Sequence, residues 1–275
     1  MNLPAWRSPA LSSLRLAAID LDGTLLGTDH QIGDANRAAV GKLMQAGLEV
    51  VLASGRHHHA MSNFARELPG VRWLISAQGG EVSDVDRTQV LEQRFLARAQ
   101  VSAAIAALNR QGMSALFYAE DGILTDSPLN DALEFYQTLS GNVLHRVSTP
   151  ALLEQPIFKV VAASSETGID QFIAGEEIAG LDLQRVRSHR RFYEFMPHGV
   201  TKASGLKTLT AHLGLNAAQV IAFGDGDNDV PMFQWAGHSV AMPHGWPDAK
   251  TAARLVAPEG DPDTAFARAV DCLLG

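Results

Sequence analysis

The stretch 17–26, with the sequence AAIDLDGTLL, places two carboxylates directly after an apolar run that is typical of a buried strand. Asp20 and Asp22 are spaced so that a strand end, or the turn after it, can hold both near one point. Gly23 bends the backbone there, and Thr24 adds a hydroxyl. In α/β folds, ligands bind in the crevice outside the carboxyl ends of the strands. The stretch therefore predicts chemistry at a sheet edge, although Asp-Gly also forms plain turns.

The residues that follow predict a β-α-β unit. Apolar residues recur on one face of a helix after Asp34 until Gly47 ends it, and LEVVLASGR then forms a second buried strand that leads into Ser54 and Gly55. Strands joined by such a crossover are parallel and near neighbours, so their ends meet at one edge of the sheet. We therefore expect Ser54 to approach Asp20.

The middle of the chain differs in pattern from its two ends. After three predicted strands, a hairpin-like alternation and further short strands and helices follow, and the parallel pattern resumes with the helix that contains Lys202. Insertion of a second domain is natural at an exposed loop. The prediction is an α/β chain with a Rossmann-like, mostly parallel sheet and helices on both faces. This core is formed by residues 14–81 and 192–275, an α+β domain is inserted at 82–191, and residues 1–13 are a loose leader.

Composition excludes several classes of function. The 275 residues are 46% hydrophobic, which suffices for a sizeable core. The formal net charge of -8 argues against a general nucleic-acid binder or a protein of anionic membrane surfaces. No signal peptide or membrane span is recognisable, and the single cysteine, Cys272, is interpreted as a buried helix residue. We expect a cytoplasmic protein, monomeric or weakly dimeric, without nucleic-acid or membrane partners.

A second acidic cluster follows the predicted strand QVIAFG. Asp225, Asp227 and Asp229 alternate with Gly226 and Asn228 in the sequence GDGDND. Crowded carboxylates repel one another, and a hard cation such as Mg²⁺, which prefers oxygen ligands, relieves the repulsion. A solvated acidic loop is the alternative. A Ca²⁺ loop of the EF-hand type is disfavoured because a strand precedes the cluster and no glutamate follows at the required spacing.

Two further positions suit an anion. Lys202 begins a predicted helix in HGVTKASGL, where the helix dipole disfavours a cation unless an anion lies nearby. Ser54 and Gly55 offer a hydroxyl and a backbone amide at a strand-to-helix junction, the kind of place that holds phosphate oxygens. Each signal is weak alone, since a lysine at a helix start can also be solvated.

The segments DLDGTLL, LASGR, GVTKASGL and GDGDNDVPM together resemble, in order and context, the four motifs of the haloacid dehalogenase-like hydrolase superfamily. The resemblance covers the whole chain, and the insert looks like the large α/β cap of the Cof-type phosphatases. It implies a Mg²⁺-dependent phosphatase acting on phosphomonoesters of small metabolites, with sugar phosphates as candidates. The segments Gln78-Gly79-Gly80 and Pro243-His244-Gly245 depart from the usual Asn-Gly-Ala and Gly-Asn of the family.

The resemblance also implies a role for each motif residue. Asp20 would be the nucleophile that forms an aspartyl-phosphate, and Asp22 would be the general acid that protonates the leaving alcohol. Asp22 must then be protonated at the first step, which a closed site of low dielectric and nearby carboxylates could favour. The implied Mg²⁺ ligands are the Asp20 carboxylate, the Asp22 carbonyl, Asp225 and, directly or through water, Asp229. The implied phosphoryl-binding groups are Ser54, the Gly55 amide, Lys202 and Asn228.

Two other functions share these features. A phosphomutase would use the same site, and a phospho-accepting signalling module also combines acidic residues, an aspartyl-phosphate, a hydroxyl and a lysine. Asp22 and the large insert argue against the signalling module. The consecutive residues His57, His58 and His59 point in different directions on a helix, so we interpret them as a partly exposed helix start and not as a metal site.

Overall fold

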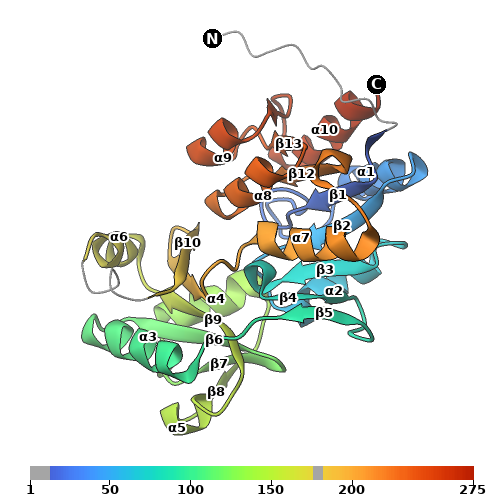
Figure 1. Cartoon of the computed structure of the whole chain (residues 1–275). Helices are drawn as coiled ribbons and strands as arrows, with labels where there is room; N and C mark the ends of the chain where they lie inside the picture. Colours follow the sequence, from blue (N-terminus) through green and yellow to red (C-terminus); the bar gives the residue numbers. More distant parts are fainter. Residues whose placement is uncertain (1–12, 176–181) are drawn as a thin grey trace.

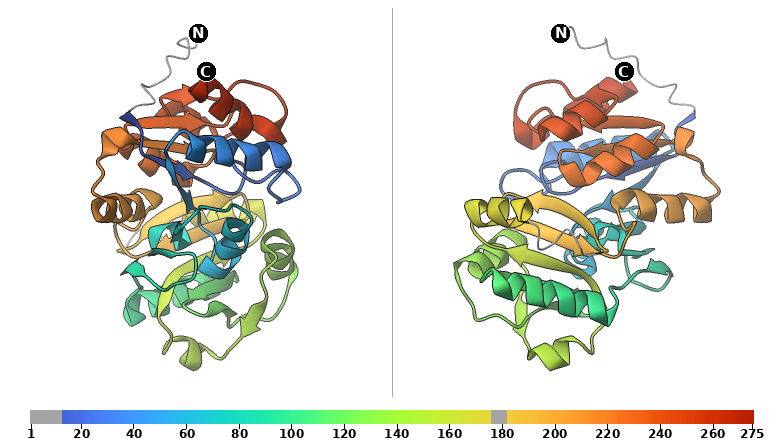
Figure 2. Two further views of the ribbon diagram at one scale, coloured as in Figure 1. Left: turned by 90° about the vertical axis from the view of Figure 1, so that its right-hand side faces the viewer. Right: turned by 60° about the vertical axis from the view of Figure 1, so that its left-hand side comes forward.

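The computed structural model describes residues 13–175 and 182–275, so the predicted leader lies almost wholly outside the described residues. The chain forms two parts, each built on a sheet of its own (Figure 1). Figure 2 shows the larger part above the smaller one, with the C-terminal helix on the larger part. In the described ranges, every helix is too short or too polar to span a bilayer.

The larger sheet has eight strands in the order β14-β13-β12-β1-β2-β3-β4-β5. The strands from β14 to β3 are parallel, and β4 and β5 extend the sheet as an antiparallel hairpin. The predicted strands are apolar along their whole length because helices cover both faces of a parallel sheet. The strands are β1 (Leu16–Ile19), β2 (Glu49–Ala53), β3 (Trp73–Ser76), β4 (Glu81–Asp84), β5 (Val90–Gln93), β12 (Val220–Gly224), β13 (His238–Ala241) and β14 (Leu255–Val256).

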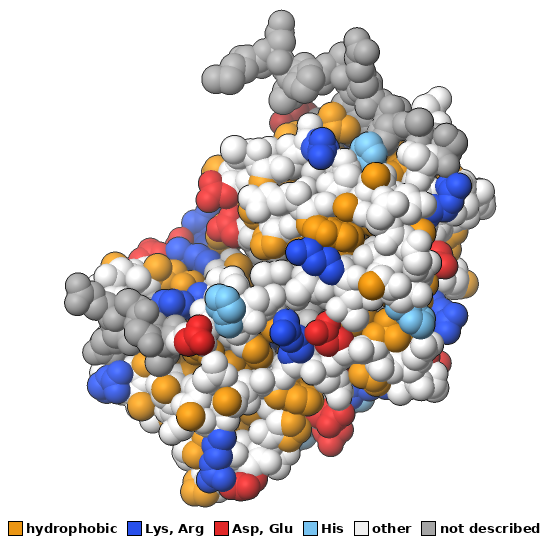
Figure 3. All heavy atoms as spheres, viewed as in Figure 1, with side chains coloured by type: hydrophobic (Ala, Val, Ile, Leu, Met, Phe, Trp, Pro, Cys, Tyr) orange, Lys and Arg blue, Asp and Glu red, His pale blue; other side chains and the backbone are white. Residues whose placement is uncertain are grey.

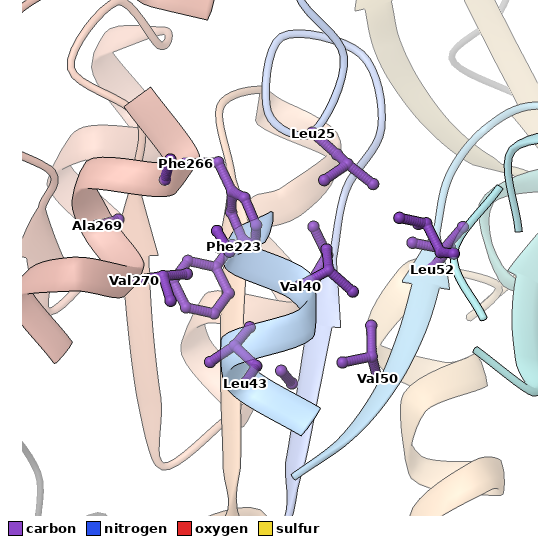
Figure 4. Packing of buried hydrophobic residues seen from close by; sticks show 14 of the residues in the cluster. Leu25, Val40, Leu43, Val50, Leu52, Phe223, Phe266, Ala269 and Val270 are labelled. Atoms are coloured by element: carbon purple, nitrogen blue, oxygen red, sulfur yellow. The ribbon is translucent and has the colours of Figure 1, made fainter. Parts of the chain in front are cut away.

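Helices lie on both faces of this sheet, which confirms the predicted fold class. One face is packed against α1, α2 and α10, and the other against α7, α8 and α9. Figure 4 shows the first face, where Val40 and Leu43 of α1 lie beside Phe223 of β12 and Val270 of α10. The helices are α1 (Asp34–Gln45), α2 (His58–Arg66), α7 (Lys202–Leu213), α8 (Val230–Trp235), α9 (Pro247–Ala252) and α10 (Ala265–Leu274), with short 3₁₀ turns at Ala77–Gly79, Ala217–Gln219, Asp227–Asp229 and Pro262–Thr264.

The cysteine was wrongly predicted to be buried. Cys272 is exposed on α10. The helix buries Ala269, Val270 and Leu273 against the sheet, and Cys272 lies beside this buried face and not within it.

The smaller sheet has six strands in the order β10-β11-β9-β6-β7-β8, antiparallel except for the pair β7 and β8. The helices α3, α5 and α6 cover one face, and α4 lies on the other, which looks toward the larger part. This part, called the cap below, comprises β6 (Ser114–Ala119), β7 (Gly122–Thr125), β8 (Leu144–Arg146), β9 (Ile157–Ala163), β10 (Gln184–His189), β11 (Phe192–Met196), α3 (Arg98–Arg110), α4 (Asp131–Ser140), α5 (Thr149–Leu152) and α6 (Glu166–Ala174). The larger part is called the core.

Sheet membership corrects both predicted boundaries of the insert. The hairpin β4-β5, placed in the insert by the boundary at residue 82, pairs with β3 in the core sheet. The strand β11, placed in the core by the boundary at residue 191, pairs with β9 in the cap sheet. The change in sequence pattern marks the start of antiparallel pairing and not the change from one sheet to the other. We therefore propose boundaries after β5 and after β11.

Candidate active site

Three strand ends meet at the carboxyl edge of the core sheet. Asp20 follows β1, Ser54 follows β2 and Asp225 follows β12, and β1 pairs in parallel with both other strands. The expected approach of Ser54 to Asp20 is therefore confirmed. Six of the predicted site residues line one cavity of about 300 Å³; they are Asp20, Asp22, Ser54, Gly55, Asp225 and Asn228. The other two, Lys202 and Asp229, are fully buried beside it.

Lys202 begins α7 and is buried against two carboxylates. Its Nζ lies 2.5 Å from Asp20 Oδ1 and 2.6 Å from Asp229 Oδ1. Burial opposes the charge of the ammonium, but the attraction of Asp20 and Asp229 outweighs it and raises the pKa of Lys202. The anion that the sequence predicted near this helix start is thus supplied by the protein itself.

The carboxylates of Asp20, Asp225 and Asp229 form a cluster in which one oxygen of each lies within 4.8 Å of the others. Burial, followed by repulsion from Asp229, raises the pKa of Asp20 and raises that of Asp225 to about 7. Gly23 makes this crowding possible, because a Cβ at its position would lie 2.5 Å from Asp225 Oδ2. Such a set of carboxylate oxygens, two of them on buried residues and one on the half-buried Asp225, fits a hard divalent cation.

Asp229 differs from the other two carboxylates in having both oxygens engaged. Oδ1 accepts the bond from Lys202, and Oδ2 accepts bonds of 2.9 Å from the backbone amides of Asp225 and Gly226. Asp229 therefore orients the acidic loop in addition to compensating the lysine.

Asp22 forms an ion pair that the sequence analysis did not predict. Arg56 Nη2 donates to Asp22 Oδ1 at 2.6 Å and Arg56 Nε donates to Oδ2 at 2.8 Å. Burial would raise the pKa of Asp22, but the hydrogen bonds from Arg56 and His30 outweigh it and lower that pKa well below its usual range. The expectation that the closed site favours a protonated Asp22 is therefore wrong for this structure, because a bidentate guanidinium stabilises the carboxylate.

Three of the four predicted phosphoryl-binding groups, Ser54, Gly55 and Asn228, line the cavity with Asp20. Ser54 Oγ accepts a hydrogen bond of 3.2 Å from the backbone amide of Arg56. Gly55 leaves room for Gln78, since a Cβ on Gly55 would lie 2.5 Å from Gln78 Nε2. Asn228 Nδ2 donates to Gln78 Oε1 at 3.3 Å.

The cap closes the other side of the cavity. Its wall combines three buried aromatic side chains, Tyr118, Tyr136 and Phe192, with the carboxylate of Glu194. The hydroxyls of Tyr118 and Tyr136 bond to each other at 2.6 Å. Figure 3 shows acidic and basic side chains close together at the left edge of the molecule, between the core above and the cap below.

Sequence reasoning missed four polar residues of the site: Arg56 as the partner of Asp22, and Gln78, Lys159 and Glu194. Lys159 stands in the otherwise apolar strand IFKVVAA and Glu194 in FYEFM. A single charge inside an apolar strand is expensive to bury without a partner, so two such charges of opposite sign were a signal for a pair.

The three histidines lie at the start of α2, which is partly exposed as expected. His57 and His58 are buried, and only the third, His59, is exposed. His57 Nε2 lies 2.8 Å from the carbonyl of Ala119 in the cap, and His58 Nδ1 lies 3.2 Å from Glu81 Oε1. Two of the three side chains are buried because the start of α2 lies where the core meets the cap.

Residues 17–269 match the family model described as haloacid dehalogenase-like hydrolase. The chain belongs to this family. Among its relatives, the HMP-PP phosphatase of Serratia proteamaculans is 30% identical over 250 residues, which cover 86% of both chains. The chloroplastic endoribonuclease YBEY of Arabidopsis thaliana is 28% identical over 89% of this chain, which spans 44% of the plant protein.

Solved structures agree with the membership. A haloacid dehalogenase-like hydrolase from Bacteroides thetaiotaomicron is 25% identical with a TM-score of 0.81, covering 94% of this chain and 98% of that one. A structure described as the subclass IIB sugar phosphatase BT4131 has the same coverage, a TM-score of 0.83 and 22% identity, and shows the same fold. Relatives that this chain covers over most of their length are named phosphatases, among them the HMP-PP phosphatases of Serratia proteamaculans and Cronobacter sakazakii.

Proposed function

We propose that the protein is a Mg²⁺-dependent phosphatase that hydrolyses phosphomonoesters of small metabolites through an aspartyl-phosphate on Asp20. The observation that carries the proposal is the buried cluster of Lys202, Asp20, Asp225 and Asp229 at the edge of a cavity that the cap closes. The cluster joins a carboxylate nucleophile, a fixed cation and oxygen ligands in one place.

In the first step, a carboxylate oxygen of Asp20 attacks phosphorus and forms a new P–O bond. The ester P–O bond breaks, and the leaving alcohol takes a proton from Asp22. In the second step, Asp22 takes a proton from water, the water oxygen attacks phosphorus and the bond to Asp20 breaks, which releases inorganic phosphate. Because Asp22 is ion-paired with Arg56 in this structure, that contact has to loosen before Asp22 can carry a proton.

The residues fit a Mg²⁺ ion held by the Asp20 carboxylate, the Asp22 carbonyl and Asp225. Of the two alternatives for Asp229, the contact through water is favoured, because both of its carboxylate oxygens already accept hydrogen bonds. When bound, the ion offsets the repulsion between the anionic nucleophile and the anionic substrate.

Ser54, the Gly55 amide, Lys202 and Asn228 are proposed to bind the phosphoryl oxygens. The interactions of these groups with the phosphoryl oxygens would become stronger as negative charge shifts onto the oxygens in the transition state. The cap is proposed to exclude bulk water, which would otherwise weaken these interactions.

The cavity limits the substrate to a small molecule. Its volume of about 300 Å³ must hold both the phosphoryl group and the leaving group. Candidates are a sugar phosphate and the substrate for which the HMP-PP phosphatases are named. Cytoplasmic residence also stays a proposal, based on the cysteine content and on such a metabolite.

A phosphate-release screen over metabolite phosphates tests the proposal. Release should require Mg²⁺, fall to background with EDTA and return when Mg²⁺ is added in excess. Release that is indifferent to EDTA would contradict the metal assignment. A long-lived phosphoaspartate without release would instead favour a signalling module, and product isomerisation without phosphate would favour a mutase.

A further inference from the structure

The cap carries a buried ion pair that the proposed mechanism does not use. Lys159 of β9 is 1% exposed and Glu194 of β11 is 4% exposed, and Lys159 Nζ lies 2.6 Å from Glu194 Oε2. Burying two charges is expensive even when they are paired, and an apolar pair would often serve stability as well. The position of this pair therefore calls for an explanation beyond stability.

The pair reaches across to the core at two points. Lys159 Nζ donates to the carbonyl of Gly55 at 2.6 Å, and Gln78 Nε2 of the core donates to Glu194 Oε2 at 3.2 Å. The other end of the Gln78 side chain accepts the bond from Asn228 Nδ2. Gly55, bonded to Lys159, and Asn228, reached through Gln78, both belong to the groups proposed to bind phosphate.

Gln78 is held in place by unusual local structure. Its backbone is left-handed, with φ 63° and ψ 22°, a conformation that few residues other than glycine adopt. Gln78 is 2% exposed. Its side-chain amide lies in space that a side chain at position 55 would need, so Gly55 makes room for it. The side-chain nitrogen of Gln78 donates to Glu194 in the cap, and its side-chain oxygen accepts from Asn228 in the core.

We propose that Gln78 is a positioning residue that couples closure of the cap to binding of the phosphoryl group. The inference rests on the proposed function. With the cap in the observed position, Glu194 accepts from the side-chain nitrogen of Gln78, and the side-chain oxygen of Gln78 orients the side-chain amide of Asn228. Lys159 holds the Gly55 carbonyl from the same side. Cap closure and phosphate binding then favour each other, because each stabilises the arrangement that the other needs.

The coupling makes a prediction that a merely structural cross-link does not. A cross-link that only stabilises the fold would change the melting temperature and leave the affinity for phosphate unaltered. A positioning role would change the affinity for every ligand with a phosphoryl group by the same factor, whatever the leaving group. An interaction of this kind, equal in ground state and transition state, alters KM more than kcat.

The test is the substitution Gln78→Asn. Asparagine tolerates left-handed backbone, so the loop should keep its conformation, but its side chain is one methylene shorter and cannot reach both Glu194 and Asn228. We expect the inhibition constant of inorganic phosphate and the KM of an alkyl phosphate and an aryl phosphate to rise about tenfold, with kcat changed by less than about threefold. Gln78→Gly, which also suits this backbone, should have an effect at least as large.

The matched control is Gln93→Asn. Gln93 also joins the core to a cap glutamate, with Nε2 at 3.1 Å from Glu120 Oε1, but it lies outside the cavity. This variant should keep the KM and the phosphate inhibition constant of the unaltered enzyme.

Two outcomes would overturn the inference while leaving the proposed function intact. One is an active Gln78→Asn enzyme with unaltered KM and phosphate inhibition constant. The other is a loss confined to the alkyl phosphate, which would tie Gln78 to leaving-group protonation. An unaltered enzyme that releases no phosphate from any ester would instead defeat the proposed function.

Discussion

At the scale of single residues, Lys202 influences the pKa of Asp20, the candidate nucleophile. Burial and neighbouring carboxylates raise the pKa of Asp20, and the ammonium of Lys202 opposes them at 2.5 Å. A lysine buried without such partners would cost several kcal/mol. Lys202 offsets part of the rise in the pKa of Asp20, and that pKa stays raised because burial and the neighbouring carboxylates outweigh the lysine.

Replacing Asp20 with asparagine should lower phosphate release from an aryl phosphate by at least about 10³-fold, because an amide cannot form the acyl phosphate. Circular dichroism should show an unaltered fold. Asp227→Asn is the control, since Asp227 lies in the same acidic loop but outside the carboxylate cluster. Turnover retained by the Asp20 variant would refute its role as nucleophile.

Replacing Asp22 with asparagine should affect substrates unequally. An alkoxide leaves poorly without a proton, so kcat/KM for an alkyl phosphate should fall roughly 10²–10⁴-fold. A dinitrophenyl phosphate, whose leaving group is stable as an anion, should lose less than about tenfold. Steady-state kinetics on the two esters measure the difference, and equal losses would exclude Asp22 as the general acid.

At the scale of elements, the strand ends carry the candidate chemistry, and the antiparallel strand β4, which lies between β3 and β5, carries a further buried charge. Glu81 at the start of β4 is fully buried, and its carboxylate bonds to Arg87 at 2.8 Å and to Ser83 at 2.9 Å. Burial alone would raise its pKa, but hydrogen bonds from His58 and Arg87 lower it to about 2. The network anchors the hairpin β4-β5 to α2.

Glu81→Gln should therefore make the fold less stable and less sensitive to acid. A carboxylate with a depressed pKa stabilises the fold above its unfolded pKa of about 4.5, and the contribution is lost as the pH falls toward 2. The shift corresponds to about 3 kcal/mol at neutral pH. Thermal unfolding should show a lower melting temperature at pH 7 and a smaller difference near pH 3.

The exposed pair of Arg37 and Glu67 supplies the control for this experiment. Glu67→Gln should change stability by less than about 1 kcal/mol, because surface ion pairs contribute little. A difference for Glu81→Gln that stayed constant from pH 7 to pH 3 would contradict the role of its ionised form.

At the scale of the whole molecule, the candidate site exists because two sheets face each other. Lys159 and Gln78 already link the cap and the core. The β6-β7 turn of the cap adds two further contacts with the core: His57 bonds to the carbonyl of Ala119, and Arg87 donates to the carbonyl of Glu120 at 3.0 Å. A ligand in the cavity contacts both parts and should stabilise them together.

Mg²⁺ with beryllium fluoride, a mimic of the aspartyl-phosphate, should raise the melting temperature of the whole chain. At a ligand concentration of 100 Kd the gain is about 2.7 kcal/mol. For a protein near this size it corresponds to roughly 5–10 °C. Differential scanning calorimetry measures the shift, and the Asp20→Asn variant, which lacks the acceptor carboxylate, should not show it. An equal shift in that variant would place the ligand elsewhere.

The convergence of Asp20, Ser54 and Asp225 could be predicted because it depends on local rules. Each residue follows an apolar strand, and parallel strands joined by right-handed crossovers bring their carboxyl ends to one edge. An anion near the helix start at Lys202 could likewise be predicted, since the helix dipole disfavours a cation there unless an anion lies nearby. The roles of these residues stay proposals that the experiments above test.

The ion pair of Asp22 and Arg56 and the chain from Asn228 through Gln78 to Glu194 could not be read in this way. Gln78 and Glu194 are 116 residues apart in the chain, and their contact depends on how the cap is seated on the core. The boundaries of the insert failed for a related reason, because a strand of given sequence can pair with either sheet.

The sequence by itself determined which strands are buried, which polar groups follow them and, through the order of four motifs, the family. These properties follow from side-chain periodicity and from the geometry of the β-α-β unit, which act over a few tens of residues. The tertiary structure alone decided which charges pair near the cavity: Arg56 with Asp22 inside the core, and Lys159 with Glu194 inside the cap. Such pairing depends on how segments that are remote in the sequence pack together, because distances of a few ångströms between them decide whether a charge is solvated, bonded or buried.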